Sequence, residues 1–312
     1  MSENQIQYRN GDYDVLLDLS NGTKIRKSRT GSFNAHRPES MDVKISNRCG
    51  HACPFCHEDS RFDGKVADLD FARVAISTFP PYTEIAVGGG NLMEDVEHTE
   101  AFLKMLVDRR CVPSITLHQK DFIENIEQVK AWRDAGLVYG VGVSLADATD
   151  PDLVKSMEQV PSAVLHVIAG LCTESDLDLL GGCGLKVLVL GYKDVRRGAA
   201  YHMGSGLESV DNNIKWLADN LEEFMASFAI VAFDNLALDQ LPVREVIGEE
   251  AFSTMFMGDD GTATFYVDLV EAEFARSSCS EKRHPMIREV GGQQMMATAQ
   301  GMFRKIKAEV TA

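Results

Sequence analysis

Three cysteines stand close together in the sequence and offer the ligands for a metal centre. Cys49, Cys53 and Cys56 lie in the run KISNRCGHACPFCHE, which spans residues 44–58. Iron–sulfur clusters are held by cysteine thiolates, and the usual cluster takes four of them. The spacing C-x3-C-x2-C supplies three thiolates from one short loop, so one iron would keep a free position that a small molecule can occupy. The motif therefore predicts an iron–sulfur redox site.

The same cysteines could instead hold a structural zinc ion. Zinc is bound in many proteins by three cysteines and one histidine, and His51 or His57 could complete such a set. A zinc knuckle normally uses two separated cysteine pairs, and the sequence has no second C-x2-C pair. A non-catalytic zinc-binding module remains the alternative from a different functional class. Because free cysteine is often buried, we expect core positions for the four scattered cysteines, Cys111, Cys172, Cys183 and Cys279.

The composition is that of a globular enzyme. The chain has 312 residues, of which 45% are hydrophobic, and this is enough for a sizeable core. It has no run of about eighteen apolar residues and begins with a polar segment, so we expect a cytoplasmic protein that is not attached to a membrane. Seven cysteines, an odd number, argue against a disulfide framework. The net charge of −16 disfavours non-specific nucleic-acid binding.

Turn signals and apolar periodicity divide the chain into elements. Strand-like runs at 13–19 and 23–26 flank Asn21-Gly22, which predicts an N-terminal β-hairpin. Strand-like and helix-like segments then alternate. The expected strands are 41–46, 84–88, 114–118, 140–145, 163–168, 186–190 and 229–233. The expected helices are 69–79, 96–109, 122–135, 151–159, 174–180 and 210–225.

The pattern changes after Phe233. Residues 234–241 are typical of a loop that enters a short helix, and Gly258–Gly261 predicts a turn before a strand at 262–270. We expect a last helix over residues 292–310. Its methionines, Met295, Met296 and Met302, are interpreted as filling the core.

Repeated strand–helix units predict a parallel sheet with right-handed crossovers. We therefore expect an α/β fold, a partial (β/α)6-type barrel with an N-terminal β-hairpin and a C-terminal α+β extension. Barrels of this kind place their chemistry in the loops that leave the C-terminal ends of the strands. The cysteine loop directly follows the first core strand, which agrees with a catalytic position.

The cysteine motif and its position after the first core strand resemble the radical S-adenosylmethionine (SAM) superfamily. The resemblance covers about residues 41–235 and implies a [4Fe–4S] cluster held by Cys49, Cys53 and Cys56, with SAM at the open iron. It also implies three parts: residues 1–40 as a hairpin element packed on the core, 41–235 as the partial barrel, and 236–312 as an extension that covers the barrel mouth.

The resemblance further assigns residues to SAM. Gly88, Gly89, Gly90 and Asn91 occupy the place of the Gly-Gly-Glu-like motif, with asparagine where the family has glutamate. Ser144, Ile168, Tyr192 and Lys193 follow or close later strands and would contact the ribose, the adenine or the substrate. His166 shares a strand face with Ile168 and is interpreted either as a core residue or as a catalytic one. No catalytic residue is assigned, and Tyr266 and Asp268 are candidates on the substrate side.

Several segments resemble a narrower, phage-associated radical SAM group. They are residues 38–40, 56–58, 88–91, 191–193 and 233–236. The analogy suggests an isomerase or rearrangement enzyme that acts on a modified nucleobase, as in thymidine hypermodification of phage DNA. Lys193, Arg196 and Arg197 could pair with a phosphate of such a substrate, or they could form a solvated loop. The alternatives are a free small metabolite or a peptide, and the resemblance implies an electron donor such as a flavodoxin or ferredoxin.

Overall fold

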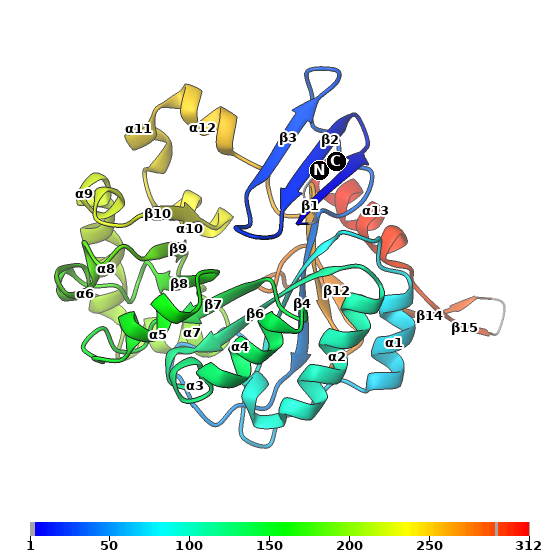
Figure 1. Ribbon diagram of the computed structural model, residues 1–312, viewed down its shortest axis with the longest axis horizontal. Coiled ribbons are helices and arrows are strands. Elements are labelled where there is room, and N and C mark those ends of the chain that lie inside the picture. Colours follow the sequence, from blue (N-terminus) through cyan, green and yellow to red (C-terminus); the bar gives the residue numbers. More distant parts are fainter. Residues whose placement is uncertain (1–3, 291–292, 312) are drawn as a thin grey trace.

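The computed structural model describes residues 4–290 and 293–311 and begins with a small antiparallel sheet (Figure 1). Its strands are β1 (Gln5–Asn10), β2 (Tyr13–Asp18) and β3 (Lys24–Ser28), in the order β1-β2-β3. The β2–β3 pair confirms the predicted hairpin. Strand β1 was missed, although Asn10-Gly11 before β2 is itself a hairpin signal, and Gly11 adopts the positive φ of 63° that such a turn favours.

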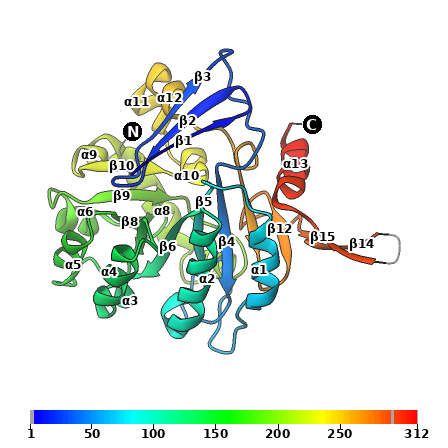
Figure 2. The ribbon, with the colours of Figure 1, turned by 45° about the vertical axis from the view of Figure 1, so that its right-hand side comes forward.

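Most of the chain surrounds one large open sheet of ten strands, which matches the predicted α/β class (Figures 1 and 2). The strand order is β10-β9-β8-β7-β6-β5-β4-β11-β12-β13. Strands β4 to β10 run parallel, β11 is parallel to β4, and β12 and β13 are antiparallel additions. The bounds are β4 (Ser40–Ser46), β5 (Glu84–Gly89), β6 (Val112–His118), β7 (Gly140–Ser144), β8 (Ala163–Ile168), β9 (Lys186–Leu190), β10 (Ile230–Phe233), β11 (Thr264–Asp268), β12 (Glu273–Ala275) and β13 (His284–Pro285).

The helices follow the strands in turn. Those connecting β4 to β10 are α1 (Leu69–Ser77), η1 (Leu92–Asp95), α2 (Val96–Asp108), α3 (Gln119–Glu124), α4 (Ile126–Asp134), α5 (Leu153–Gln159), α6 (Glu174–Leu180), α7 (Arg197–Met203), α8 (Leu207–Asp219) and α9 (Leu221–Ala226). After β10 come α10 (Asn235–Gln240), α11 (Val243–Ile247), α12 (Glu249–Met255) and α13 (Ala299–Val310). Among the described residues, no helix combines the length and the apolar character needed to cross a membrane.

Two predicted helices are each divided in two at an asparagine. Residues 122–135 correspond to α3 and α4, which meet at Asn125, and residues 210–225 correspond to α8 and α9, which meet at Asn220. In both places the side-chain amide donates to the carbonyl four residues earlier, Asn125 to Asp121 and Asn220 to Trp216. Asparagine side chains compete with the backbone for such bonds, which explains why the helix ends there.

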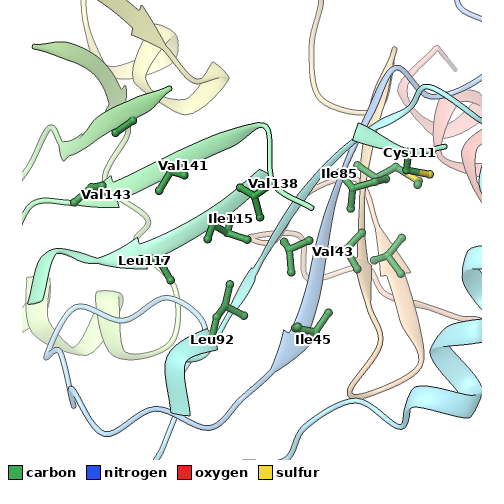
Figure 3. Packing of buried hydrophobic residues seen from close by; sticks show 14 of the residues in the cluster. Val43, Ile45, Ile85, Leu92, Cys111, Ile115, Leu117, Val138, Val141 and Val143 are labelled. Carbon is green, nitrogen blue, oxygen red and sulfur yellow. The ribbon is translucent and has the colours of Figure 1, made fainter. Parts of the chain in front are cut away.

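The two faces of the sheet differ in chemistry. Under the helices, alternate strand residues are buried and apolar, and Figure 3 shows Val43, Ile85, Ile115 and Val141 packed side by side in this core. The opposite face, called the inner face below, carries small and polar residues at the intervening positions. Examples are Asp42 on β4, Gly88 on β5, Ser144 on β7 and His166 on β8. The alternation of a strand thus separates a stabilising face from one that is available for a site.

The C-terminal part differs from the prediction. Met295 and Met296 lie in strand β15 (Gln293–Met296), which pairs with β14 (Ile287–Val290), and helix α13 begins only at Ala299. Thr298 is its N-cap and accepts from the amide of Gly301, so the helix starts after the hairpin. Met302 is buried, as predicted, whereas Met295 is exposed. Gly292, where the helix was expected to begin, lies outside the described residues.

The predicted cysteine burial is half right. Cys111 and Cys172 are buried, whereas Cys183 is exposed and Cys279 is half-buried. Cys183 lies in the turn between α6 and β9, where its thiol donates to the carbonyl of Leu179 at the surface.

Candidate active site

The cysteine loop leaves the C-terminal end of β4, and all three of its thiols are half-buried. Glu94 in η1 holds the loop, because its carboxylate accepts the amide hydrogen of Gly50 at 2.6 Å. Ala52 and Asp59 take positive φ values of 52°, which L-residues rarely adopt. Backbone of this kind persists where the surroundings fix it, and such positions cluster at functional sites.

The glycine segment that ends β5 and follows it, Gly88–Gly90, packs mainly against the segment that enters the cysteine loop. Gly90 donates its amide hydrogen to the carbonyl of Ser46 at 2.6 Å, and a Cβ at Gly90 would lie 2.1 Å from the carbonyl oxygen of Arg48. Gly89 would similarly meet Ser46, whereas a Cβ at Gly88 would have open space around it. Two of the three glycines are thus required by contact between backbones, and Gly88 is the one that leaves room for a ligand.

Asn91 uses its side-chain oxygen within the protein. That oxygen accepts the amide hydrogen of Met93 at 2.9 Å and caps η1, while the backbone amide of Asn91 donates to Arg48. The residue therefore fixes the start of η1, the short helix that places Glu94 against the loop.

His51 is held by His118, which ends strand β6, and by Asp121, which lies in helix α3. Its Nε2 atom lies 2.5 Å from Oδ2 of Asp121 in α3, and its ring stacks on His118 at the end of β6, with the centroids 3.9 Å apart. Burial lowers the pKa of His118, and the neighbouring His51 lowers it further. The stacked pair and the carboxylate fix the first half of the cysteine loop.

The second half of the loop is anchored through Glu58. Its buried carboxylate lies 3.0 Å from Nζ of Lys44 and accepts from the hydroxyl of Tyr266 in β11. Burial by itself would raise the pKa of Glu58, but contacts with His57 and Lys44 outweigh this effect and hold the pKa well below its usual range. Glu58 is therefore ionised and joins the loop to both β4 and β11.

Arg196 and Arg197 bind the loop, so their side chains are not free for a phosphate. Arg196 donates to the carbonyl of His57 and Arg197 to the carbonyl of Ser60, each at 2.5 Å. Arg197 also pairs with Asp59 at 3.1 Å. This clamp on the cysteine loop was not predicted; Arg196 is exposed, as expected for a solvated loop, and Arg197 begins helix α7.

Ser144 and His166 lie beside each other on the inner face. They are partners in the register of β7 and β8, and Ser144 is also the partner of His118 on β6. The His166 ring lies over Gly142, where a Cβ would come within 2.2 Å of it. Burial and then Lys193 lower the pKa of His166 to about 4, so the imidazole is neutral at pH 7.

Ile168 on β8 and Asp42 on β4 also lie on the inner face. Ile168 follows His166 by two positions on β8, and both are half-buried. Several charged side chains face Asp42, which is exposed to solvent. Burial raises its pKa to about 6, with Asp260 and Asp234 adding to the effect and Lys193 opposing it.

Tyr192 and Lys193 follow β9 and differ in role. Tyr192 is buried, its hydroxyl donates to the carbonyl of Gly198, and its backbone pairs with the side chain of Gln240. Lys193 reaches the cysteine loop, where its Nζ atom lies 3.2 Å from Nε2 of His57. Of these two predicted contacts, the side chain of Lys193 is the one directed at the loop.

The thiol geometry bears on which metal centre would fit. Sulfur ligands of tetrahedral zinc lie about 3.8 Å apart when each Zn–S bond is about 2.3 Å. In the described part of the chain, the one set of three ligand groups whose donor atoms all lie within 4.8 Å comprises His51, His118 and Asp121, not the cysteines. The three loop thiols are the ligand type that iron–sulfur clusters take, and all three come from one loop.

Four residues near the cysteine loop were not predicted from the sequence to belong to the site. They are Glu94, His118, Asp121 and Arg283, which come from η1, β6, α3 and the segment after β12. His118 was accessible to prediction, because it ends an expected strand on the edge where the cysteine loop lies. No sequence motif around Arg283 indicates a place in the site. It lies 225 residues after Glu58, and only the fold brings the two segments together.

Of the comparisons with known proteins, the one with solved structures bears on the fold. No protein-family model matches the chain, and no curated protein matches it. The chain is similar to SuiB of Streptococcus suis, solved bound to S-adenosylmethionine, with a TM-score of 0.58, 11% identity, and coverage of 100% of this chain and 90% of SuiB. SuiB bound to the precursor peptide SuiA gives a TM-score of 0.59 at 10% identity with the same coverage.

A third structure, anSMEcpe with bound S-adenosylmethionine, gives a TM-score of 0.48 at 10% identity and covers 86% of this chain and 80% of that one. At these identities, the likeness to SuiB demonstrates a shared fold. The chain therefore shares with SuiB an open, mainly parallel α/β sheet, and the α/β class is the one that the sequence predicts.

Proposed function

We propose that this chain is a radical SAM enzyme in which Cys49, Cys53 and Cys56 hold a [4Fe–4S] cluster and SAM occupies the open iron. The observation that carries the proposal is the position of the three thiols. They lie on one loop at the C-terminal end of β4, beside an inner face lined with small and polar residues. Loops at this edge carry the chemistry of (β/α) folds.

When bound, the cluster and SAM supply a 5′-deoxyadenosyl radical that removes a hydrogen atom from a substrate carbon. The protein supplies position and shielding. Glu94, Asp121 and Glu58 hold the cysteine loop from three sides, so the thiols are presented in a fixed arrangement. Preorganisation of this kind lowers the cost of assembling the reactants.

Open space at Gly88 supports a place for SAM beside the cysteine loop. Ser144 and Ile168, on neighbouring strands of the inner face, are proposed to contact its ribose and adenine. Gly89, Gly90 and Asn91 are proposed to act indirectly, by fixing the loop and η1. Tyr192 is proposed to act indirectly, because its side chain is buried and its backbone pairs with Gln240.

The C-terminal part is proposed to shield the site. Tyr266 donates to Glu58 of the cysteine loop, and Ser278 accepts from Lys193, which itself contacts His57 of that loop. Exclusion of water protects reactive intermediates. We retain the division into residues 1–40, 41–235 and 236–312, with the last part covering the site and β11 extending the core sheet.

The proposed substrates, a modified nucleobase and a peptide, are supported by different observations. The isomerase reaction on a modified nucleobase rests on sequence resemblance, and of its three expected phosphate ligands only Lys193 is not committed to clamping the loop. A peptide substrate has the likeness to peptide-bound SuiB in its favour. A one-electron donor of the flavodoxin or ferredoxin class is proposed to reduce the cluster, and we place the enzyme in the cytoplasm, where thiols stay reduced.

Anaerobic reconstitution with iron and sulfide tests the proposal. The reduced protein is incubated with SAM, and 5′-deoxyadenosine and methionine are measured by chromatography. We expect a brown protein with about four irons per chain that forms both products. A colourless protein that takes up zinc and leaves SAM intact would establish the zinc module instead.

A further inference from the structure

Two cations from distant parts of the chain meet at Ser278, beside the cysteine loop. Lys193, which follows β9, places its Nζ atom 3.2 Å from the Ser278 hydroxyl oxygen. Arg283, which precedes β13, donates from Nη2 to the Ser278 carbonyl at 2.6 Å. Ser278 itself is buried, with 8% of its surface exposed.

Neither cation has a carboxylate partner. In the described part of the chain, no Asp or Glu oxygen lies within 4.0 Å of the charged nitrogens of Lys193 or Arg283, whereas Lys44 next to them pairs with both Glu58 and Asp268. The other partner of Lys193 is His57.

Carboxylates are plentiful in this chain, although none that the structure describes pairs with these two cations. With a net charge of −16, anionic side chains outnumber cationic ones. Half-buried cations are costly unless they are paired or hydrogen-bonded. Asp42 and Asp234 interact with Lys193 at longer range, but they do not occupy the space next to Ser278. Two cations without a carboxylate partner among the described residues thus meet at Ser278, where an incoming anion would pair with both.

The guanidinium of Arg283 is positioned by the ring of Tyr266. Its central carbon lies 4.8 Å from the centroid of the Tyr266 ring, and Tyr266 is fixed by Glu58. Stacking on an aromatic ring leaves the edge of the guanidinium free to donate, and its planar fork matches carboxylate and phosphate oxygens.

We infer that Lys193, Arg283 and the hydroxyl of Ser278 bind a carboxylate or phosphate group of the substrate. The inference rests on the proposed function, which places the reaction beside this cluster of residues. In that function the carboxylate of SAM binds the open iron, so the substrate is the source of a second anion. The site narrows the substrate to a molecule with an anionic group a short distance from the reacting carbon.

Calorimetric titration of reconstituted protein with inorganic phosphate, with and without saturating SAM, tests the inference. We expect one phosphate per chain, bound whether or not SAM is present. Lys193→Met and Arg283→Gln should each weaken binding about tenfold, which is the loss expected for one charge-assisted contact. The control is Lys282→Gln, which removes the neighbouring exposed cation that pairs with Glu309 and should leave phosphate affinity unchanged.

Three results would overturn the inference. They are no phosphate binding, binding that both variants leave unchanged, and phosphate displaced by SAM, which would assign these residues to the carboxylate of SAM. Failure of the proposed function would appear separately, as reconstituted wild-type protein that does not cleave SAM, and phosphate binding remains measurable in that protein.

Discussion

The hydroxyl of Tyr266 lies 3.2 and 3.3 Å from the two carboxylate oxygens of Glu58, and this contact joins the C-terminal strand β11 to the exit of the cysteine loop. Burial, and then the Glu58 charge, raise the pKa of Tyr266 well above its usual value, so the hydroxyl stays protonated and donates. A bond to an ionised acceptor in a buried place is stronger than most hydrogen bonds.

Tyr266→Phe should therefore destabilise the protein. We expect the free energy of unfolding to fall by about 1 to 3 kcal/mol, the range for a hydrogen bond to a charged group. Urea unfolding of the metal-free protein, followed by circular dichroism, measures the change. A loss below about 0.5 kcal/mol would show that Lys44 alone satisfies Glu58.

Single replacements of the loop cysteines should remove the cluster and keep the fold. Cys49→Ala, Cys53→Ala and Cys56→Ala each delete one of three ligands, so iron should drop from about four atoms per chain to near zero after reconstitution. The half-buried loop contributes little to the core, and the circular dichroism spectrum should be unchanged. Cys183→Ala, at an exposed position, is the matched control and should retain its iron.

Gly142 leaves space for the ring of His166, so a methyl group there should be costly. Gly142→Ala would place Cβ 2.2 Å from the ring, and relieving the overlap should lower the free energy of unfolding by about 1 to 3 kcal/mol. In a His166→Ala background the same change should be neutral or stabilising, because alanine suits a strand better than glycine. If Gly142→Ala lowered the free energy of unfolding equally in the wild type and in His166→Ala, the contact between Gly142 and the His166 ring would be refuted.

Asp42→Asn should stabilise the protein at neutral pH. The pKa of Asp42 is raised from 3.8 to about 6 in the folded state, so the folded protein binds the proton more tightly, and its stability falls as the pH rises between these two values. Asparagine removes this penalty. Because solvent reaches Asp42, we expect a gain below about 2 kcal/mol.

Thermal melting of the metal-free Asp42→Asn protein and the wild type at pH 4.5 and 7.5 measures the effect. The gain at pH 7.5 should exceed the gain at pH 4.5. The same gain at both values would show that the charge of Asp42 is not destabilising. The charges that face it are those of Lys193, Asp260, Asp234 and Glu58.

The sequence predicted the elements that depend on local signals. Each of the seven parallel strands from β4 to β10 lies within two residues of its expected position, because apolar alternation and flanking turns are read along the chain. The errors have local causes too. Asn125 and Asn220 end helices through their side chains, and Thr298 delays the start of α13.

The site could be predicted only in part. The thiol ligands were evident because all three lie in one short segment. The contacts that hold and complete the site, such as Tyr266 with Glu58 and Arg283 with Ser278, join segments that only the folded sheet brings together. The same long-range packing directs Arg196 and Arg197 to the cysteine loop, where the sequence suggested a phosphate.

Electron paramagnetic resonance of the anaerobically reconstituted, reduced protein, recorded with and without SAM, tests the central claim most directly. We predict a [4Fe–4S]+ signal that changes shape when SAM is added, because SAM binds the iron that has no cysteine ligand. A protein that gives no such signal and holds zinc at Cys49, Cys53 and Cys56 would contradict the account.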